Sequence, residues 1–286
     1  MTIREAYLLG REHLAASEST EPAVEAEMLL RFVLGVDRAR LYTHWGGVMP
    51  DAGWARYQSV LEDRARGRPV HYIVGTREFM GLAFTVDERV MIPRPETELL
   101  VEFAAARLRG RPEPVVVDVG TGSGCIAVSL AHLLPDAVVY ATDLLGDPLE
   151  VAAVNAARHG VADRVTLLQG DLLDALSPAL RGRVDAVLSN PPYVPEEQAP
   201  QLPREIRDHE PREAVLAPGD GLVHHRRLAS TAPAWLRPSG VLAMEVGLGQ
   251  DRAVAQLLSD PVRYASLGVV ADGAGIGRVV WGAVEK

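Results

Sequence analysis

The sequence predicts an α/β protein in which a small all-α domain and a β-hairpin linker precede a doubly wound parallel sheet. Three observations predict this fold: helical spacing of apolar residues over the first seventy positions, a short stretch rich in β-branched and aromatic residues, and a later alternation of strand and helix signals. With 286 residues, the chain is long enough for two domains of ordinary size. We place the three parts at residues 1–70, 71–92 and 93–286.

The first part is expected to contain three helices, because apolar residues recur three or four positions apart between turn residues. The first helix includes Ile3 and Leu14. The second begins at Pro22 and ends at Gly35, since proline suits a helix start and glycine a helix end. The third runs from about Asp51 to Arg66. We interpret the apolar faces of these helices as packed core.

Residues from about Val70 to Ile92 favour a short hairpin, because β-branched and aromatic residues there are interrupted by Gly75 and Gly81. The next segment, Pro93-Arg94-Pro95-Glu96-Thr97-Glu98, combines prolines that favour extended backbone with acidic residues that suit a helix N-terminus. A helix start and a functional loop explain this segment equally well.

The remainder of the chain alternates between short apolar strands and helices, the pattern of a parallel sheet covered on both faces. The predicted strands are Val115–Val119, Val138–Ala141, Val165–Gln169, Val184–Ser189 and Val241–Val246. The predicted helices are Ile126–Leu134, Pro148–Arg158, Val223–Trp235 and Arg252–Leu258. Two last strands, Tyr264–Val270 and Arg278–Val284, flank a glycine-rich turn and form an antiparallel hairpin. Ligands are expected at the carboxyl ends of the parallel strands.

Composition excludes several classes of protein. The only cysteine is Cys125, so neither an intrachain disulfide nor a thiolate zinc site can form. Apolar runs are shorter than the roughly 18 residues of a membrane span, and early charges interrupt any signal-peptide region. The net charge of −9, with an acidic excess in both halves, disfavours nucleic acid as a partner. We expect a cytoplasmic protein without a membrane partner.

A glycine-rich turn follows the first strand of the sheet, with the sequence Gly120-Thr121-Gly122-Ser123-Gly124. Glycines let a ligand lie directly against the backbone. The spacing G-x-G-x-G differs from the G-x-G-x-x-G of dinucleotide sites and favours a ligand without a pyrophosphate, such as S-adenosylmethionine. A tight structural turn is the alternative. Asp143, at the end of the second strand, could accept both ribose hydroxyls or be a solvated strand-end residue.

Two further positions could meet the adenine of such a ligand. Asp171 follows the third strand and could contact the edge of the base, with Leu172 against its ring. Glu245 lies near the end of a later strand, and a functional role and a purely structural one remain equally open for it. The eight histidines have no metal-ligand spacing, and no G-x-S-x-G motif is present. We therefore expect neither a metal nor serine-based catalysis.

The segment Asn190-Pro191-Pro192-Tyr193 directly follows an apolar strand and carries the strongest functional signal. Two consecutive prolines cannot continue a sheet, so the chain leaves the strand stiffly. The Asn190 side-chain oxygen and the Pro191 carbonyl can then accept both hydrogens of a planar –NH2 group. Holding those N–H bonds out of plane localises the nitrogen lone pair and directs it at a sulfonium methyl. Tyr193 would provide an aromatic wall for the planar group.

At these residues the chain resembles the PrmC/HemK family, methyltransferases that modify the glutamine of the Gly-Gly-Gln motif in peptide chain release factors. The resemblance covers nearly the whole chain. Besides the glycine turn and Ser189–Tyr193, it includes Gly67–Ile73, Met91–Glu98, His209–Leu216 and Ala274–Val280. Asn-Pro-Pro-Tyr is shared with adenine and guanine amino-methyltransferases, whereas the segments Met91–Glu98 and His209–Leu216 are specific to this family.

The resemblance implies a helical domain that helps to dock the release factor, a hairpin linker and a seven-stranded, Rossmann-like methyltransferase domain. It implies that Gly120–Gly124, Asp143, Leu172 and Asn190 contact S-adenosylmethionine, and that Asn190–Tyr193 hold the glutamine. Some members have an aromatic residue at the position of Leu172, so adenine packing here would be aliphatic. We expect a monomer that methylates the N5 nitrogen of glutamine. The alternatives are a nucleic-acid amino-methyltransferase using the same tetrad and a binding module without catalysis.

Overall fold

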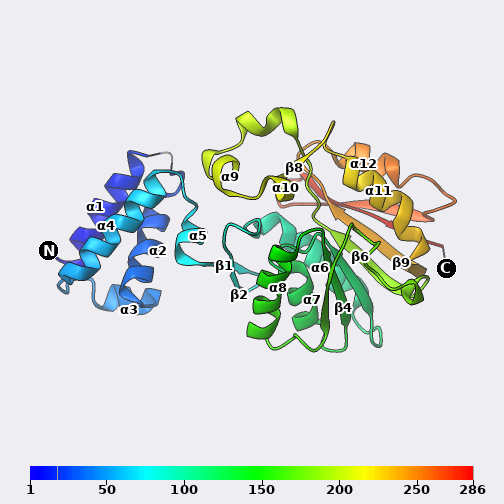
Figure 1. Cartoon of the computed structure of the whole chain (residues 1–286), viewed down its shortest axis with the longest axis horizontal. Coiled ribbons are helices and arrows are strands. Elements are labelled where there is room, and N and C mark those ends of the chain that lie inside the picture. The colour runs from blue at the N-terminus through cyan, green and yellow to red at the C-terminus, as the bar shows by residue number, and fades with distance from the viewer. Residues whose placement is uncertain (18, 286) are drawn as a thin grey trace. The chain divides into compact units, whose positions relative to one another are not determined.

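The computed structural model describes residues 1–17 and 19–285 (Figure 1). The chain forms two compact units. The first comprises Met1–Thr76 together with Leu202–His209, and the second comprises Arg77–Gln201 and Glu210–Lys286. No helix within the described residues is long and apolar enough to cross a membrane.

The first unit is helical. Its helices are α1 (Ile3–Ala15), α2 (Pro22–Leu34), α3 (Arg38–Thr43), α4 (Asp51–Ala65), α5 (Val70–Val74) and α9 (Arg204–His209). Thr2 and Glu5 form a capping box at the start of α1, and Gly35 ends α2 in the left-handed conformation. Arg64 of α4 is 5% exposed and donates two hydrogen bonds of 2.9 Å to Glu25. This buried ion pair joins α4 to α2 inside the predicted core.

The stretch predicted as a hairpin from Val70 to Ile92 is a hairpin only in its middle. Val70–Val74 forms helix α5, which ends at Gly75 with φ +74°. The strands are β1 (Thr76–Phe79) and β2 (Leu82–Thr85). The β-branched residues before Gly75 form a helix because Val70 and Tyr72 are buried there, and tertiary packing overrides their strand preference.

The second unit contains the predicted seven-stranded sheet, in the order β10-β11-β9-β6-β3-β4-β5. Its strands are β3 (Val115–Val119), β4 (Val138–Asp143), β5 (Val165–Gln169), β6 (Val184–Ser189), β9 (Leu236–Glu245), β10 (Ser266–Ala271) and β11 (Gly277–Ala283). The central strands are parallel, and β11 pairs antiparallel with both β9 and β10. The predicted terminal hairpin is therefore confirmed.

Helices cover both faces of the sheet, as predicted. They are α6 (Glu98–Leu108), α7 (Cys125–Leu133), α8 (Gly146–Arg158), α11 (Val223–Thr231) and α12 (Asp251–Leu257). Alternate residues of β3 enter different cores: Val116 packs with α6, α7 and α8, whereas Val117 packs with α11 and α12. Phe79 and Phe84 of the hairpin extend the first of these cores, with ring centroids 6.0 Å apart.

The remaining elements are short. They are β7 (Val194–Pro195), β8 (Leu216–Ala217), α10 (Arg212–Val215) and the 3-10 turns Pro95–Thr97, Pro178–Leu180, Glu196–Gln201 and Ala232–Ala234. Strand β9 starts at Leu236, five residues before the predicted Val241. Its pairing with β6 is irregular in this early part, where Ser239 has φ +63°. A sequence containing Pro238 and Gly240 gives no strand signal there, because both residues are disfavoured in strands.

Candidate active site

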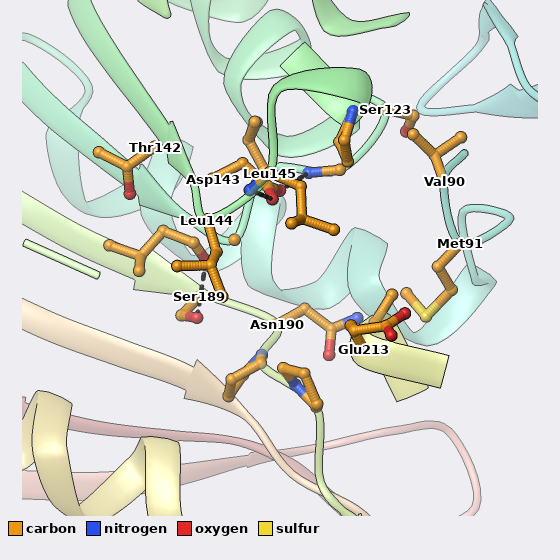
Figure 2. A pocket seen from close by; sticks show the side chains of 18 of the residues that line it. Val90, Met91, Ser123, Thr142, Asp143, Leu144, Leu145, Ser189, Asn190 and Glu213 are labelled. Carbon is orange, nitrogen blue, oxygen red and sulfur yellow. Dashed lines mark hydrogen bonds between the residues drawn. The ribbon is translucent and has the colours of Figure 1, made fainter. Parts of the chain in front are cut away.

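A pocket opens at the carboxyl ends of the parallel strands and is lined only by residues of the second unit (Figure 2). The chain moves from β3 outward to β4 and β5, and then returns to the other side of β3 with β6. Such a switch point leaves a crevice between neighbouring strand ends. The crevice is a partly open cavity of about 150 Å3.

The glycine turn after β3 forms one wall of the pocket. Gly120, Gly122 and Gly124 have φ angles of +73°, +53° and +79°, which side chains other than glycine rarely adopt. The backbone nitrogens of Gly120 and Thr121 both donate to the Thr142 carbonyl, at 2.8 and 2.9 Å, so the turn is fixed to the end of β4. Nothing lies within 4 Å of where a Cβ on Gly120 or Gly122 would be. These two positions therefore leave bare backbone facing open space.

Asp118 supports this turn from below. Its side chain is fully buried, and Oδ2 accepts hydrogen bonds from the Thr121 hydroxyl at 2.6 Å and the Ala127 nitrogen at 3.1 Å. Burial raises the pKa of the Asp118 carboxyl to about 7, although the hydrogen bonds oppose that shift. Asp118 thus joins the strand, the turn and α7, a role that the sequence alone does not indicate.

Asp143 lies at the end of β4, as predicted, and it lines the pocket. Its predicted contact with ribose hydroxyls stays a prediction. Its Oδ2 accepts from the Gly122 nitrogen at 3.0 Å, and its Oδ1 accepts from the Leu145 nitrogen at 3.2 Å. Burial raises the pKa of this carboxyl. Figure 2 shows Asp143 beside Leu145. A carboxylate held by backbone donors beside bare glycine backbone is suited to accept hydrogen bonds from a pair of sugar hydroxyls.

Asp171 and Leu172 also line the pocket. Asp171 accepts hydrogen bonds of 3.0 and 2.8 Å from Arg227 of α11, which lowers the pKa of the carboxyl. Leu172 has φ +52°, and its carbonyl accepts from the Thr142 hydroxyl at 2.9 Å. The turn after β5 is therefore fixed both to β4 and to α11.

Asn190, Pro191 and Pro192 line the opposite side of the pocket, beyond the end of β6. The Ser189 hydroxyl donates to the Val119 carbonyl at 2.8 Å and so joins the ends of β6 and β3. The Asn190 Nδ2 donates to the Thr97 hydroxyl at 3.0 Å, and that hydroxyl donates to Glu245 Oε2 at 2.6 Å. The amide nitrogen of Asn190 is thus engaged by the protein.

Tyr193 is not among the residues that line the pocket. Its ring packs on Gly247, where an added Cβ would lie 3.0 Å from Cδ2 of the tyrosine. Its hydroxyl faces Glu245 Oε1 at 3.5 Å, and Gln250 Nε2 donates to its carbonyl at 2.9 Å. Burial raises the pKa of the Tyr193 hydroxyl. The predicted role of Tyr193 as an aromatic wall stays a prediction.

Glu245 is 2% exposed at the end of β9. Burial raises the pKa of its carboxyl to about 7, while the hydrogen bond from Thr97 opposes the shift. Its backbone carbonyl lies 2.8 Å from His225 Nε2. Glu245 itself does not line the pocket, but it reaches Asn190 through a single hydroxyl.

Several pocket residues were not predicted. Thr97 lies in the segment Met91–Glu98, and Glu213 lies in the segment His209–Leu216. Both segments are specific to the resembled family, and that specificity was the sequence signal that could have indicated these two residues. Figure 2 shows Glu213 near Asn190 and Met91. His224 of α11 also lines the pocket, on the side of Asp171. No cluster of possible metal ligands occurs within residues 1–17 and 19–285.

Known proteins resemble the chain along its length. Residues 5–75 match the family described as PrmC N-terminal domain, and residues 95–209 match the methyltransferase small domain. A release factor glutamine methyltransferase from Moorella thermoacetica is 42% identical and covers 97% of each chain. Its counterpart from Chlorobaculum tepidum is 41% identical and covers 90% of this chain and 89% of that protein. The solved structure of a methyltransferase from Pyrococcus furiosus has a TM-score of 0.53 at 16% identity, covering 81% of this chain and 99% of that chain, a likeness of fold alone.

Proposed function

The chain belongs to the release factor glutamine methyltransferase family, and on that premise we propose that it methylates the glutamine side-chain nitrogen in the Gly-Gly-Gln motif of release factors. The single observation that carries this proposal is the link from Thr97 to Asn190 beside the two prolines. The link holds the amide nitrogen of Asn190 and leaves its oxygen as the acceptor for a substrate.

S-adenosylmethionine is the cofactor, and it supplies a methyl group made electrophilic by a positively charged sulfur. The pocket fits this molecule, because Gly120 and Gly122 leave open space where side chains would stand. We assign the sugar hydroxyls to Asp143 and the adenine to Asp171 and Leu172. Thr121 and Ser123, which also line the pocket, would follow the ligand with backbone and small side chains. Gly124, which was also predicted to contact the ligand, does not line the pocket but packs against Ala152.

On the side of the site that would bind the methyl acceptor, the protein would act by orienting the glutamine amide. A glutamine amide is a weak nucleophile, since its nitrogen lone pair is delocalised into the carbonyl. The Asn190 oxygen and the Pro191 carbonyl would accept its two N–H bonds and direct the lone pair at the methyl carbon. The nitrogen would form a bond to the methyl carbon as the carbon–sulfur bond breaks, and the sulfur would keep the electron pair of that bond as a neutral thioether. The methylated nitrogen carries a positive charge and loses its extra proton to water, so no general base is needed beforehand.

The parts of the chain would divide this work. We propose that residues 1–70 help to dock the release factor, that residues 71–92 link the parts, and that residues 93–286 bind the cofactor and catalyse transfer. We further propose that the protein acts as a cytoplasmic monomer, without nucleic acid or membrane as a direct partner. The acidic net charge of −9 supports the exclusion of nucleic acid.

The test is a competition for labelled methyl groups. The protein is incubated with S-adenosylmethionine labelled in its methyl group, together with purified release factor, DNA and ribosomal RNA. We expect label on the release factor, at the glutamine of the Gly-Gly-Gln motif, and a release factor with that glutamine changed to glutamate serves as the control. Label on DNA or RNA alone would support an exocyclic-amine methyltransferase instead.

A further inference from the structure

We propose that Thr97 and Glu245 are positioning residues that fix the orientation of the Asn190 amide, so that its oxygen rather than its nitrogen faces the substrate. This inference rests on the proposed function, because it concerns the group that would hold the glutamine. Glu245 acts only through Thr97, and neither residue needs to touch the reacting atoms.

The direction of the hydrogen bonds carries the argument. A hydroxyl has one hydrogen to donate, and an ionised carboxylate can only accept. The Thr97 hydroxyl is 2.6 Å from Glu245 Oε2, a short distance typical of a charge-assisted bond in which the hydroxyl donates. Its oxygen can then only accept from Asn190, and the group 3.0 Å away must be the Nδ2 donor. An ionised Glu245 therefore dictates which end of the amide faces the pocket.

This orientation matters because a primary amide substrate presents two donors to the site. The Asn190 oxygen can accept one of them, whereas a flipped amide would direct its own N–H bonds at the substrate N–H bonds. The two orientations are nearly equal in shape, so packing alone discriminates poorly between them. The hydrogen bonds from Asn190 to Thr97 and from Thr97 to Glu245 form a directional relay, and this relay selects one orientation of the amide.

Protonation of Glu245 would remove this control. A protonated carboxyl can donate to Thr97, whose hydrogen is then free to point at Asn190 and favour the flipped amide. Burial, which brings the pKa of Glu245 to about 7, places this change near neutral pH. Two charged groups near the carboxyl act on its pKa: Glu96 raises it and Arg278 lowers it. Tyr193 faces Oε1 of Glu245, and His225 contacts the backbone carbonyl of Glu245. Cys125 is a further titratable group nearby.

The first test separates the hydroxyl of Thr97 from its shape. T97V keeps the branched side chain but removes the donor and acceptor, and we expect kcat to fall about 10-fold with little change in the dissociation constant of S-adenosylmethionine. T97S restores the hydroxyl and should recover most of kcat. T166V, on the exposed side of strand β5, is the matched control. Equal kcat in T97V and the wild type would overturn the proposal, and so would an equal loss in T97S.

The second test does not depend on turnover. In the ligand-free protein, the 15N and 1H signals of the Asn190 side-chain amide are followed by NMR from pH 5 to 9. We expect the signals to shift with a midpoint near pH 7 in the wild type and to stay constant in E245Q and T97V. The same midpoint should appear in the pH profile of wild-type kcat and be absent from that of E245Q. A midpoint that persists in E245Q would show that another group controls the amide.

The controls distinguish this inference from the proposed function. If the wild-type protein does not methylate release factors, the proposed function fails, whatever the NMR signals show. If the wild type methylates them and N190A abolishes the activity while T97V and E245Q behave as the wild type, only the relay is wrong.

Discussion

Two turns at neighbouring strand ends build opposite sides of the pocket, and they do so by opposite means. The turn after β3 has three glycines with positive φ angles, and at Gly120 and Gly122 bare backbone faces open space in the pocket. The exit after β6 uses two prolines, which remove backbone freedom and backbone donors. The glycine turn is suited to close contact along a ligand, whereas the diproline exit is suited to holding a few acceptors in fixed places.

The support of the two turns differs as well. The glycine turn is held by backbone bonds to Thr142 and by Asp143, both within about twenty residues of it along the chain. Asn190 is held by Thr97, 93 residues before it, and Thr97 is held by Glu245, which is 148 residues away from Thr97. On the proposed function, we therefore expect binding of the methyl donor to depend on local contacts, and orientation of the acceptor to depend on three segments that are distant in the sequence. Changes on the two sides should alter different measured quantities.

The largest effect is expected on the acceptor side. N190A removes the side-chain acceptor while the prolines keep the exit in place, so kcat should fall by about 10²- to 10³-fold, the usual scale for losing one preorganised hydrogen-bonding group. Affinity for S-adenosylmethionine, measured by calorimetry, should change much less. Turnover close to that of the wild type would contradict the amide-holding mechanism.

The relay beneath Asn190 should also appear in the pH dependence of stability. The folded-state pKa of Glu245 is about 7, above its ordinary value of 4.5, so the folded protein binds this proton more tightly than the unfolded chain does. The proton on Glu245 therefore stabilises the folded protein fully below about pH 4.5, and this stabilisation is lost as the pH rises through 7. The free energy of unfolding should decrease by on the order of 3 kcal/mol over this range.

Urea unfolding at pH 5 and pH 8 measures this effect. The wild type should be less stable at pH 8, and E245Q should show a smaller loss between the two pH values. Asp118, whose pKa burial also raises to about 7, leaves a residual loss in both proteins. An identical pH dependence in the two proteins would exclude Glu245 as the source.

On the donor side, G122A and G124A should separate binding from folding. Both positions have positive φ angles, so alanine costs about 1–2 kcal/mol of backbone strain at either one. At Gly124 a Cβ would also lie 3.0 Å from the Ala152 Cβ, whereas at Gly122 it would enter open space in the pocket. G124A should therefore lose more stability in urea unfolding. G122A should raise the dissociation constant of S-adenosylmethionine about 10-fold, equivalent to about 1.4 kcal/mol.

The same contrast explains what the sequence could predict. The glycine turn and Asp143 were recognisable because their spacing along the chain follows from a single βαβ unit. The diproline exit was recognisable because consecutive prolines after an apolar strand have few structural explanations. The central strands followed from the alternation of strand and helix signals, and the final hairpin followed from the turn at Asp272–Gly277. The order of the strands in the sheet came only from the structure.

The contact of Thr97 with Asn190 and Glu245 could not be predicted, because a helix start explains the local sequence of Thr97 as well as a functional loop does. Its hydroxyl meets Asn190 and Glu245 only after the sheet brings three segments together. For the same reason, burial of Glu245 and Asp118, and hence their raised pKa values, followed only from the folded structure. Helix α5 was missed because strand preference at Val70–Val74 is weaker than the packing that buries Val70 and Tyr72.

The smallest expected effect is the change of the Michaelis constant with salt concentration. It tests whether the acceptor side of the pocket binds a neutral amide. A nucleic acid substrate would require many phosphate contacts, and its affinity would fall about 10³- to 10⁵-fold between 50 and 200 mM salt. A glutamine amide carries no charge, and Asn190 and Pro191 offer only neutral acceptors. The Michaelis constant for release factor should therefore rise less than about 3-fold over this range, with kcat unchanged, because screening affects only the charges around the docking surface. A steep logarithmic slope would instead mean that the two turns serve a nucleic acid base.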